Sequence, residues 1–103
     1  MAQKSIAGHN VEVNAEGYLI NPGEWNKDIA EGIAAEIGIS LTDKHYEVLH
    51  YLREQYAAEV PLTIRKVGKS GIVDIKGLYT LFPGGPLKYS SKIAGIPKPA
   101  SCV

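Results

Sequence analysis

The sequence predicts an α+β fold, in which a small N-terminal β-meander packs against an array of helices and a mobile C-terminal arm follows. Three observations support this prediction. Apolar and polar residues alternate near the N-terminus, within residues 4–20. Apolar residues then recur at helical spacing from residue 24 to residue 94. The ending GIPKPASCV, which starts at Gly95, has no periodic apolar face and is stiffened by two nearby prolines.

Length and composition indicate one folded domain. The chain has 103 residues, of which 45% are apolar and 21% charged, close to the averages of globular proteins. We expect a globular domain over residues 1–94 and a flexible arm over residues 95–103. The sequence has no apolar run long enough for a membrane helix and no secretory signal at its start, so we expect a cytoplasmic protein that does not bind membranes.

The first elements follow from local patterns. Val11 and Val13 alternate with polar residues between turn-forming segments, which predicts two or three short antiparallel strands. A helix is predicted over residues 24–37, ended by Gly38. The residues expected on its apolar face are Trp25, Ile29, Ile33 and Ile37.

The remaining chain predicts further helices. The longest lies within residues 40–59, begins at Thr42 and has a stripe formed by Tyr46, Leu49, Leu52 and Tyr56. Thr63 caps a short helix that ends near residues 68–71. Another short helix over residues 74–82 is expected to face inward through Ile75, Leu78, Tyr79 and Phe82. A last helical piece spans residues 87–94.

The net charge of zero conceals an asymmetry. Residues 1–60 contain four basic and ten acidic side chains, whereas residues 61–103 contain seven basic side chains and one acidic one. This split suggests that the second half approaches an anionic partner, and Arg65, Lys92 and Lys98 are the candidate partner-binding residues. The alternative is that the two halves complement each other within one fold.

Three other kinds of site have weaker support: a metal site, a phosphate-binding loop and a DNA-binding region. His45 and His50 are five residues apart on one predicted helix and therefore face different directions, so we predict no metal site. The glycines near residue 70 lack a phosphate-loop pattern, and we predict no cofactor. The predicted helices of residues 42–82, with their basic side chains, could instead resemble a helix-turn-helix, which leaves DNA binding as an alternative function.

Cys102 is the only cysteine of the chain and the candidate catalytic residue. It is next to the last residue of a proline-stiffened ending, where chains are usually exposed. From Gly95 to Cys102 an extended chain of this kind reaches on the order of 20 Å. A thiol that passes a group onward by exchange needs access and mobility more than a base of its own.

Several separated motifs resemble the DsrC/TusE family. The ending KIAGIPKPASCV, residues 92–103, is similar to the family's C-terminal signature KxAGxPKPxxCV. Earlier matches are VEVNAEGYL at residues 11–19 together with Trp25, LTDKHYEVLHYLREQY at residues 41–56, the Ile64-Arg65 pair, and LYTLFPGGP at residues 78–86. The resemblance covers essentially the whole chain.

The resemblance implies that Cys102 accepts, carries and donates sulfur as a persulfide. Family members that work with dissimilatory sulfite reductase have a second cysteine eleven residues earlier, where this chain has Ser91. We therefore expect a sulfur carrier without its own turnover pocket. Its expected partners are a sulfur-donor protein and a sulfur-acceptor protein, of the tRNA-thiolation type or from dissimilatory sulfur metabolism. An alternative function is that of a non-catalytic gamma-type subunit of sulfite reductase.

Overall fold

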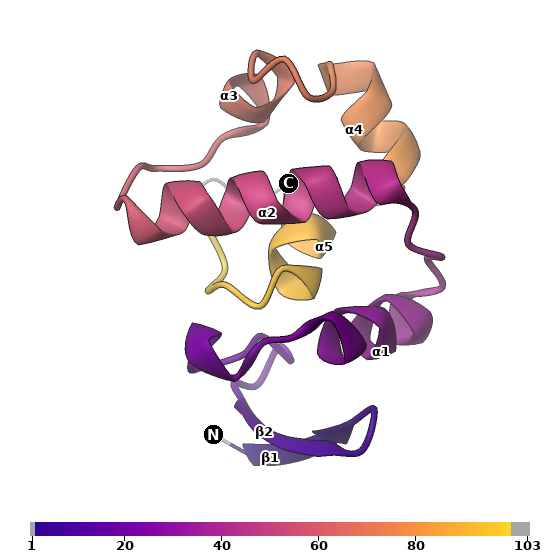
Figure 1. Cartoon of the computed structure of the whole chain (residues 1–103), viewed down its shortest axis with the longest axis vertical. Coiled ribbons are helices and arrows are strands. Elements are labelled where there is room, and N and C mark those ends of the chain that lie inside the picture. The colour runs from indigo at the N-terminus through magenta and orange to yellow at the C-terminus, as the bar shows by residue number, and fades with distance from the viewer. Residues whose placement is uncertain (1, 100–103) are drawn as a thin grey trace.

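Residues 2–99 are the part of the chain that the computed structural model describes. They form a two-stranded hairpin followed by five α-helices, which confirms the predicted α+β class. The elements are β1 (Ala2–Ile6), β2 (His9–Val13), the 3-10 helix η1 (Pro22–Glu24), α1 (Lys27–Ile37), α2 (Asp43–Ala57), α3 (Ile64–Gly68), α4 (Ile75–Leu81) and α5 (Pro86–Ile93). Figure 1 shows the hairpin at one end, α3 and α4 at the other, and α5 between α1 and α2.

The hairpin is antiparallel and pairs Ala2 with Val13 and Ile6 with His9. Its two-residue turn has positive φ at both Ala7 (51°) and Gly8 (83°), the backbone shape that matches the twist of two paired strands. The third strand allowed by the sequence is reduced to a single bridge between Val13 and Leu19.

Helix α1 begins three residues later than the sequence predicts. The Asn26 side chain accepts the backbone N–H of Ile29 at 2.9 Å and so caps a helix that starts at Lys27. Trp25 therefore lies before the helix, not on its apolar face. The predicted end is confirmed, because Gly38 adopts the left-handed conformation with φ of 93°.

Helix α2 begins after Thr42, as predicted, but its buried face is shifted from the predicted stripe. Leu49 and Leu52 are buried, whereas Tyr46 is only half-buried and Tyr56 is 42% exposed. His45 takes an inward position and donates from Nε2 to the Leu81 carbonyl at 2.9 Å, since its Nδ1 accepts the backbone N–H of Thr42. This contact joins the start of α2 to the end of α4.

The short helix α3 begins at its predicted cap, Thr63. Helix α4 begins one residue later than predicted, because Asp74, expected as its first residue, caps it by accepting the backbone N–H of Gly77. In α4, Leu78 is buried together with the following Phe82, but the predicted inward positions of Ile75 and Tyr79 are wrong: both are more than 40% exposed. A seven-residue helix presents one stripe to the core, and residues 78 and 82 occupy it. Residues 75 and 79 lie on the neighbouring, outward face.

Helix α5 occupies the centre of the helical stack and packs against both α1 and α2. Leu87, Ser90, Ser91 and Ile93 on this helix are each 0% exposed. Because the arm follows directly after α5, the core fixes the position from which the arm starts. No helix within residues 2–99 has the length and apolarity needed to cross a bilayer.

Candidate functional site

The C-terminal arm carries Cys102, which lies outside the described residues together with the rest of residues 100–103. The structure does describe the arm from Gly95 to Pro99 and the surface around it. The role of Cys102 therefore stays a prediction.

The start of the arm is packed, which differs from the sequence-based expectation of an unpacked segment from Gly95 onward. Ile96 is 1% exposed and belongs to the hydrophobic core, whereas Pro97 and Lys98 are exposed. The backbone N–H groups of Gly95 and Ile96 donate to the carbonyls of Lys92 and Ser91, each at 3.2 Å. One apolar side chain is too short a signal for a periodicity argument, so the sequence pattern did not reveal this contact.

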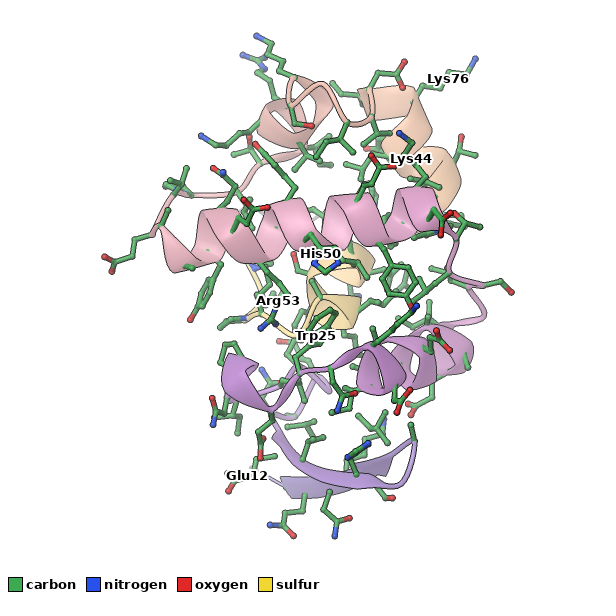
Figure 2. The ribbon with its side chains drawn as sticks, in the orientation of Figure 1. Glu12, Trp25, Lys44, His50, Arg53 and Lys76 are labelled. Atoms are coloured by element: carbon green, nitrogen blue, oxygen red, sulfur yellow. The ribbon has the colours of Figure 1, made fainter. Side chains whose placement is uncertain are left out.

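Two planar side chains, Trp25 and Arg53, contact the same turn. The Trp25 Nε1–H donates to the Ile93 carbonyl at 2.7 Å, and Arg53 Nη1 donates to the Ala94 carbonyl at 2.8 Å. The Arg53 guanidinium also lies over the indole ring, 4.3 Å from its centroid. Figure 2 shows both side chains in the space between α2 and the η1 segment, in front of α5. Partial burial lowers the pKa of Arg53 from its usual value.

The sequence patterns predict no functional role for Arg53 and place Trp25 only on the apolar face of a helix. A signal was nevertheless present in the composition. Trp25 is the only tryptophan of the chain, and Arg53 is the only arginine of its acidic first sixty residues. Guanidinium and indole groups stack on each other in a way that lysine does not reproduce, but their proximity depends on the tertiary fold.

Lysines surround the turn that precedes Tyr18. Lys98 Nζ lies 2.8 Å from Glu16 Oε2, and the Lys92 ammonium is 5.9 Å from the centre of the buried Tyr18 ring. The hydrogen bond from Lys98 is the main cause that lowers the pKa of Glu16, and the charges of Lys88 and Lys92 contribute. The structure thus brings together two of the three predicted partner-binding residues, Lys92 and Lys98, around one carboxylate.

The third predicted residue, Arg65, is on a different element. It is exposed on α3, and none of the hydrogen bonds and ion pairs found within residues 2–99 joins its side chain to the arm. The structure therefore does not unite the three basic residues into one site. Arg65 belongs to the basic α3–α4 end of the molecule, which also contains Lys66, Lys69 and Lys76.

A shallow apolar pocket of about 260 Å³ lies beside the described part of the arm. It is lined by the arm itself, over residues 96–99, together with Tyr56 and residues 60–63. Lys98 is the only side chain of the lining that carries a formal charge. The pocket offers apolar contact rather than a set of acid and base groups.

Neither His45 nor His50 lines the pocket beside the arm. His45 is 7% exposed, with both ring nitrogens hydrogen-bonded, and packs edge-on against Phe82 with the centroids 5.1 Å apart. His50 is exposed, and its ring lies edge-on to Trp25 at 6.2 Å. Within the part of the chain that the structure describes, no group of three or more metal-binding side chains is placed to hold an ion.

Comparisons with known proteins agree with this architecture. The family model described as "DsrC like protein" matches residues 5–103. The chain belongs to the DsrC-like family. It is 37% identical to the sulfurtransferase TusE homolog of Haemophilus influenzae, with 96% of this chain and 98% of that protein covered.

Solved structures of DsrC-like proteins give the same result. The crystal structure of dissimilatory sulfite reductase I (DsrI) has a TM-score of 0.87 and 31% identity, covering 99% of this chain and all of that one. The NMR structure of Allochromatium vinosum DsrC has a TM-score of 0.81 and 34% identity, covering 98% of this chain and 97% of that one. This DsrC-like chain is a sulfur-relay protein of the DsrC/TusE family.

Ser91, the position of the second cysteine in the DsrC/TusE resemblance, lies within α5 and not on the arm. Its side chain is 0% exposed, and its Oγ has no hydrogen-bond partner among the described residues. The neighbouring Ser90, equally buried, donates to the Leu87 carbonyl at 3.3 Å. A buried hydroxyl without a partner is unfavourable, so residue 91 occupies an environment that suits an apolar group or a thiol better.

Proposed function

We propose that this protein carries sulfur as a persulfide on Cys102. The supporting observation is that the family match extends to residue 103, so that the chain's only cysteine falls at the penultimate position of the family's ending. The described geometry is consistent with this role. The core anchors the arm up to Ile96 and leaves five residues between this anchor and Cys102.

The proposed transfer is a thiol exchange without net oxidation. The Cys102 thiolate attacks the outer sulfur of a donor persulfide, a new S–S bond forms at Cys102, and the donor cysteine leaves as a thiolate. An acceptor thiolate then attacks the outer sulfur on Cys102 and regenerates the Cys102 thiolate. The protein is accordingly a carrier between two partners, and we infer no turnover pocket of its own. The cytoplasm, where thiols are kept reduced, is the proposed compartment.

We further propose that the partners present acidic groups to the basic surface beside the arm. Lys92 and Lys98 lie around Glu16, and Lys88 adds a third positive charge to this region. Arg65 would contact a partner separately, from the exposed face of α3. Such charges accelerate encounter and are screened over about 8 Å in physiological salt. Charge reversal at Lys92 should therefore weaken association and reduce its dependence on salt.

The tRNA-thiolation type of relay is favoured over a role with sulfite reductase. The curated relative described above is a sulfurtransferase TusE homolog. Ser91 removes the second thiol that the sulfite-reductase partners of the family use, so this chain cannot form an internal disulfide between residues 91 and 102. A gamma-type subunit of sulfite reductase is the second candidate, supported by the similarity to the gamma-subunit of the dissimilatory sulfite reductase (DsrC) from Archaeoglobus fulgidus, with a TM-score of 0.81 and 29% identity. Copurification with sulfite reductase subunits would favour it.

Intact-mass spectrometry tests the sulfur-carrier proposal. The wild-type protein is incubated with a small-molecule persulfide, the persulfide of glutathione, and then with a reductant. We expect a gain of one or more sulfur atoms that the reductant removes. Cys102→Ser should gain none, and the adjacent Ser101→Ala should load like the wild type. Loading of Cys102→Ser, or no loading of the wild type, would contradict the proposal.

DNA binding has less support from the structure. Helices α3 and α4, which carry the basic side chains of the predicted helix-turn-helix, have five and seven residues. At 1.5 Å per residue they span only about 8 Å and 10 Å, short for a helix that reads bases along the major groove. A gel-shift assay over a range of salt concentrations distinguishes this alternative from the sulfur-carrier function.

A further inference from the structure

We propose that Arg53 and Trp25 are positioning residues, which fix the point and the direction from which the arm leaves the body of the protein. The proposal rests on the function proposed for Cys102, because positioning matters only if the end of the arm must reach a partner. It concerns residues 22–96, all of which the structure describes.

The first support is the hydrogen bonding at the end of α5. The last carbonyls of a helix have no donor within the helix and need partners from elsewhere. The carbonyls of Ser90, Ser91 and Lys92 accept the backbone N–H groups of the turn that follows them. The next two carbonyls, those of Ile93 and Ala94, are satisfied by Trp25 and Arg53 at 2.7 and 2.8 Å. Side chains far away in the sequence thus complete this helix end.

The second support is the contact between Gly95 and the indole ring. Gly95 has φ of +72°, and a Cβ built on it would lie 2.3 Å from Trp25 Cδ1. In this left-handed turn, the chain can pass so close to the indole ring only as glycine. Trp25 therefore determines the path of the chain at Gly95, in addition to donating a hydrogen bond to the Ile93 carbonyl. Ile96 enters the core immediately afterwards.

The third support is that Arg53 joins three segments at once. Its Nη2 donates to the Pro22 carbonyl at 3.1 Å while its Nη1 donates to the Ala94 carbonyl, and the guanidinium lies over the Trp25 ring. The η1 segment, helix α2 and the start of the arm therefore meet at one side chain (Figure 2). Lysine has neither the planar fork nor the stacking surface to make these contacts together.

The consequence concerns the volume that Cys102 can sample. Cys102 is six positions after Ile96, which allows a reach of roughly 19 Å in an extended conformation. If the start of the arm is fixed, this reach is centred on one point with one starting direction. If the start is released, the arm can leave the protein in many more directions. The orientation in which Cys102 meets the thiol of a partner then becomes rarer, as happens when reacting groups are no longer held in place.

Amide hydrogen exchange tests whether Arg53 and Trp25 hold this turn. The variants are Arg53→Met, Arg53→Lys and Trp25→Phe; the last keeps an aromatic ring but removes the indole N–H. We expect the Gly95 and Ile96 amides to exchange about tenfold faster or more in Arg53→Met and Trp25→Phe, with amides in the middle of α2 nearly unchanged. Arg53→Lys should give the same local effect to a smaller extent.

The control is Lys44→Met, on the same helix. Lys44 also donates to a backbone carbonyl, that of Ile72 at 3.1 Å, but this carbonyl belongs to the loop before α4. Its loss should leave the exchange of Gly95 and Ile96 unchanged. If the Arg53 variants accelerate exchange uniformly along the chain, or leave these two amides protected, the residues are not positioning residues. If Arg53→Met fails to fold, Arg53→Lys and Trp25→Phe decide the question.

A distance measurement tests the consequence for the end of the arm. Trp25 and Cys102 are single copies, so Trp25 is the energy donor and an AEDANS fluorophore attached to Cys102 is the acceptor. Time-resolved transfer should give a broader or shifted distance distribution in Arg53→Met than in the wild type and Lys44→Met. An unchanged distribution would overturn the proposal. Neither measurement depends on sulfur loading, so failure of the sulfur-carrier function and failure of positioning are distinguishable.

Discussion

Glu16 and Lys98 form an ion pair with a separation of 2.8 Å between Oε2 and Nζ, although they are 82 positions apart in the sequence. The pair connects the turn after the hairpin to the described end of the arm. The acidic first half of the chain thus does complement the basic second half at this point. The same lysine also belongs to the surface that we propose for partner binding, so an acidic partner would compete with Glu16.

The ion pair predicts a pH dependence. The hydrogen bond from Lys98 lowers the pKa of Glu16, so the pair contributes stability above the ordinary pKa of a glutamate and loses it as the pH falls through the lowered value. Lys98→Gln should shift the pKa of Glu16 upward, toward its ordinary value, in an NMR titration of the side-chain carboxyl carbon. Lys4→Gln, which breaks the separate contact with Glu36, should leave it unchanged.

The Gly95→Ala substitution should be strongly destabilising. A residue with a Cβ in the left-handed conformation and against Trp25 costs about 3 kcal/mol in total. Gly38→Ala is a matched control, because Gly38 also has positive φ but faces open space. It should cost only about 1 kcal/mol. Urea unfolding gives both values, and equal losses would show that the Trp25 contact is unimportant. Trp25 fluorescence should change only in Gly95→Ala.

The boundary between the core and the arm can be measured at Ile96. Because its side chain is buried, Ile96→Ala should lower the free energy of unfolding by about 2–5 kcal/mol. The exposed neighbour Pro97 should tolerate Pro97→Ala with a loss below about 1 kcal/mol. Thermal and urea unfolding of the two variants check this. A small effect at both positions would place the start of the arm before residue 96, as the sequence pattern suggests.

The Ser91→Cys substitution should stabilise the fold by about 1 kcal/mol, since it replaces a buried hydroxyl that lacks a partner by a more apolar thiol. Ser90→Cys is the control at an equally buried site. There the hydroxyl donates to the Leu87 carbonyl, so no stabilisation is expected. Urea unfolding under reducing conditions compares them. If Ser90→Cys gains as much as Ser91→Cys, the missing hydrogen bond is not the cause.

The Ser91→Cys variant also tests whether Cys102 can reach residue 91 in α5. Under oxidant we expect an intramolecular disulfide with Cys102, detected as the loss of both thiols without a dimer. The bond should form slowly, because residue 91 is buried and a bridge needs Cα atoms within about 7 Å. A protein that remains reduced, or that only forms intermolecular disulfides, would show that Cys102 does not reach α5.

Local sequence patterns were sufficient to predict the hairpin and most of the helix boundaries. Side-chain caps act over three or four residues, which is why Thr42 and Thr63 marked the starts of two helices correctly, and Gly38 marked the end of another. The α+β class followed from the change of apolar period after the hairpin. The lone cysteine near the end of the chain and the family motifs indicated the relay function.

The tertiary structure decided which faces are buried and what holds the arm. Ile75 and Tyr79 fit a helical stripe in the sequence, yet only one stripe of the short α4 meets the core. The contacts of Trp25 and Arg53 with Ile93 and Ala94 span dozens of residues, and no local pattern encodes them. Periodicity and capping depend on residues that are close in the sequence. The contacts that Trp25 and Arg53 make with the start of the arm depend instead on segments that come together only when α5 packs between α1 and α2.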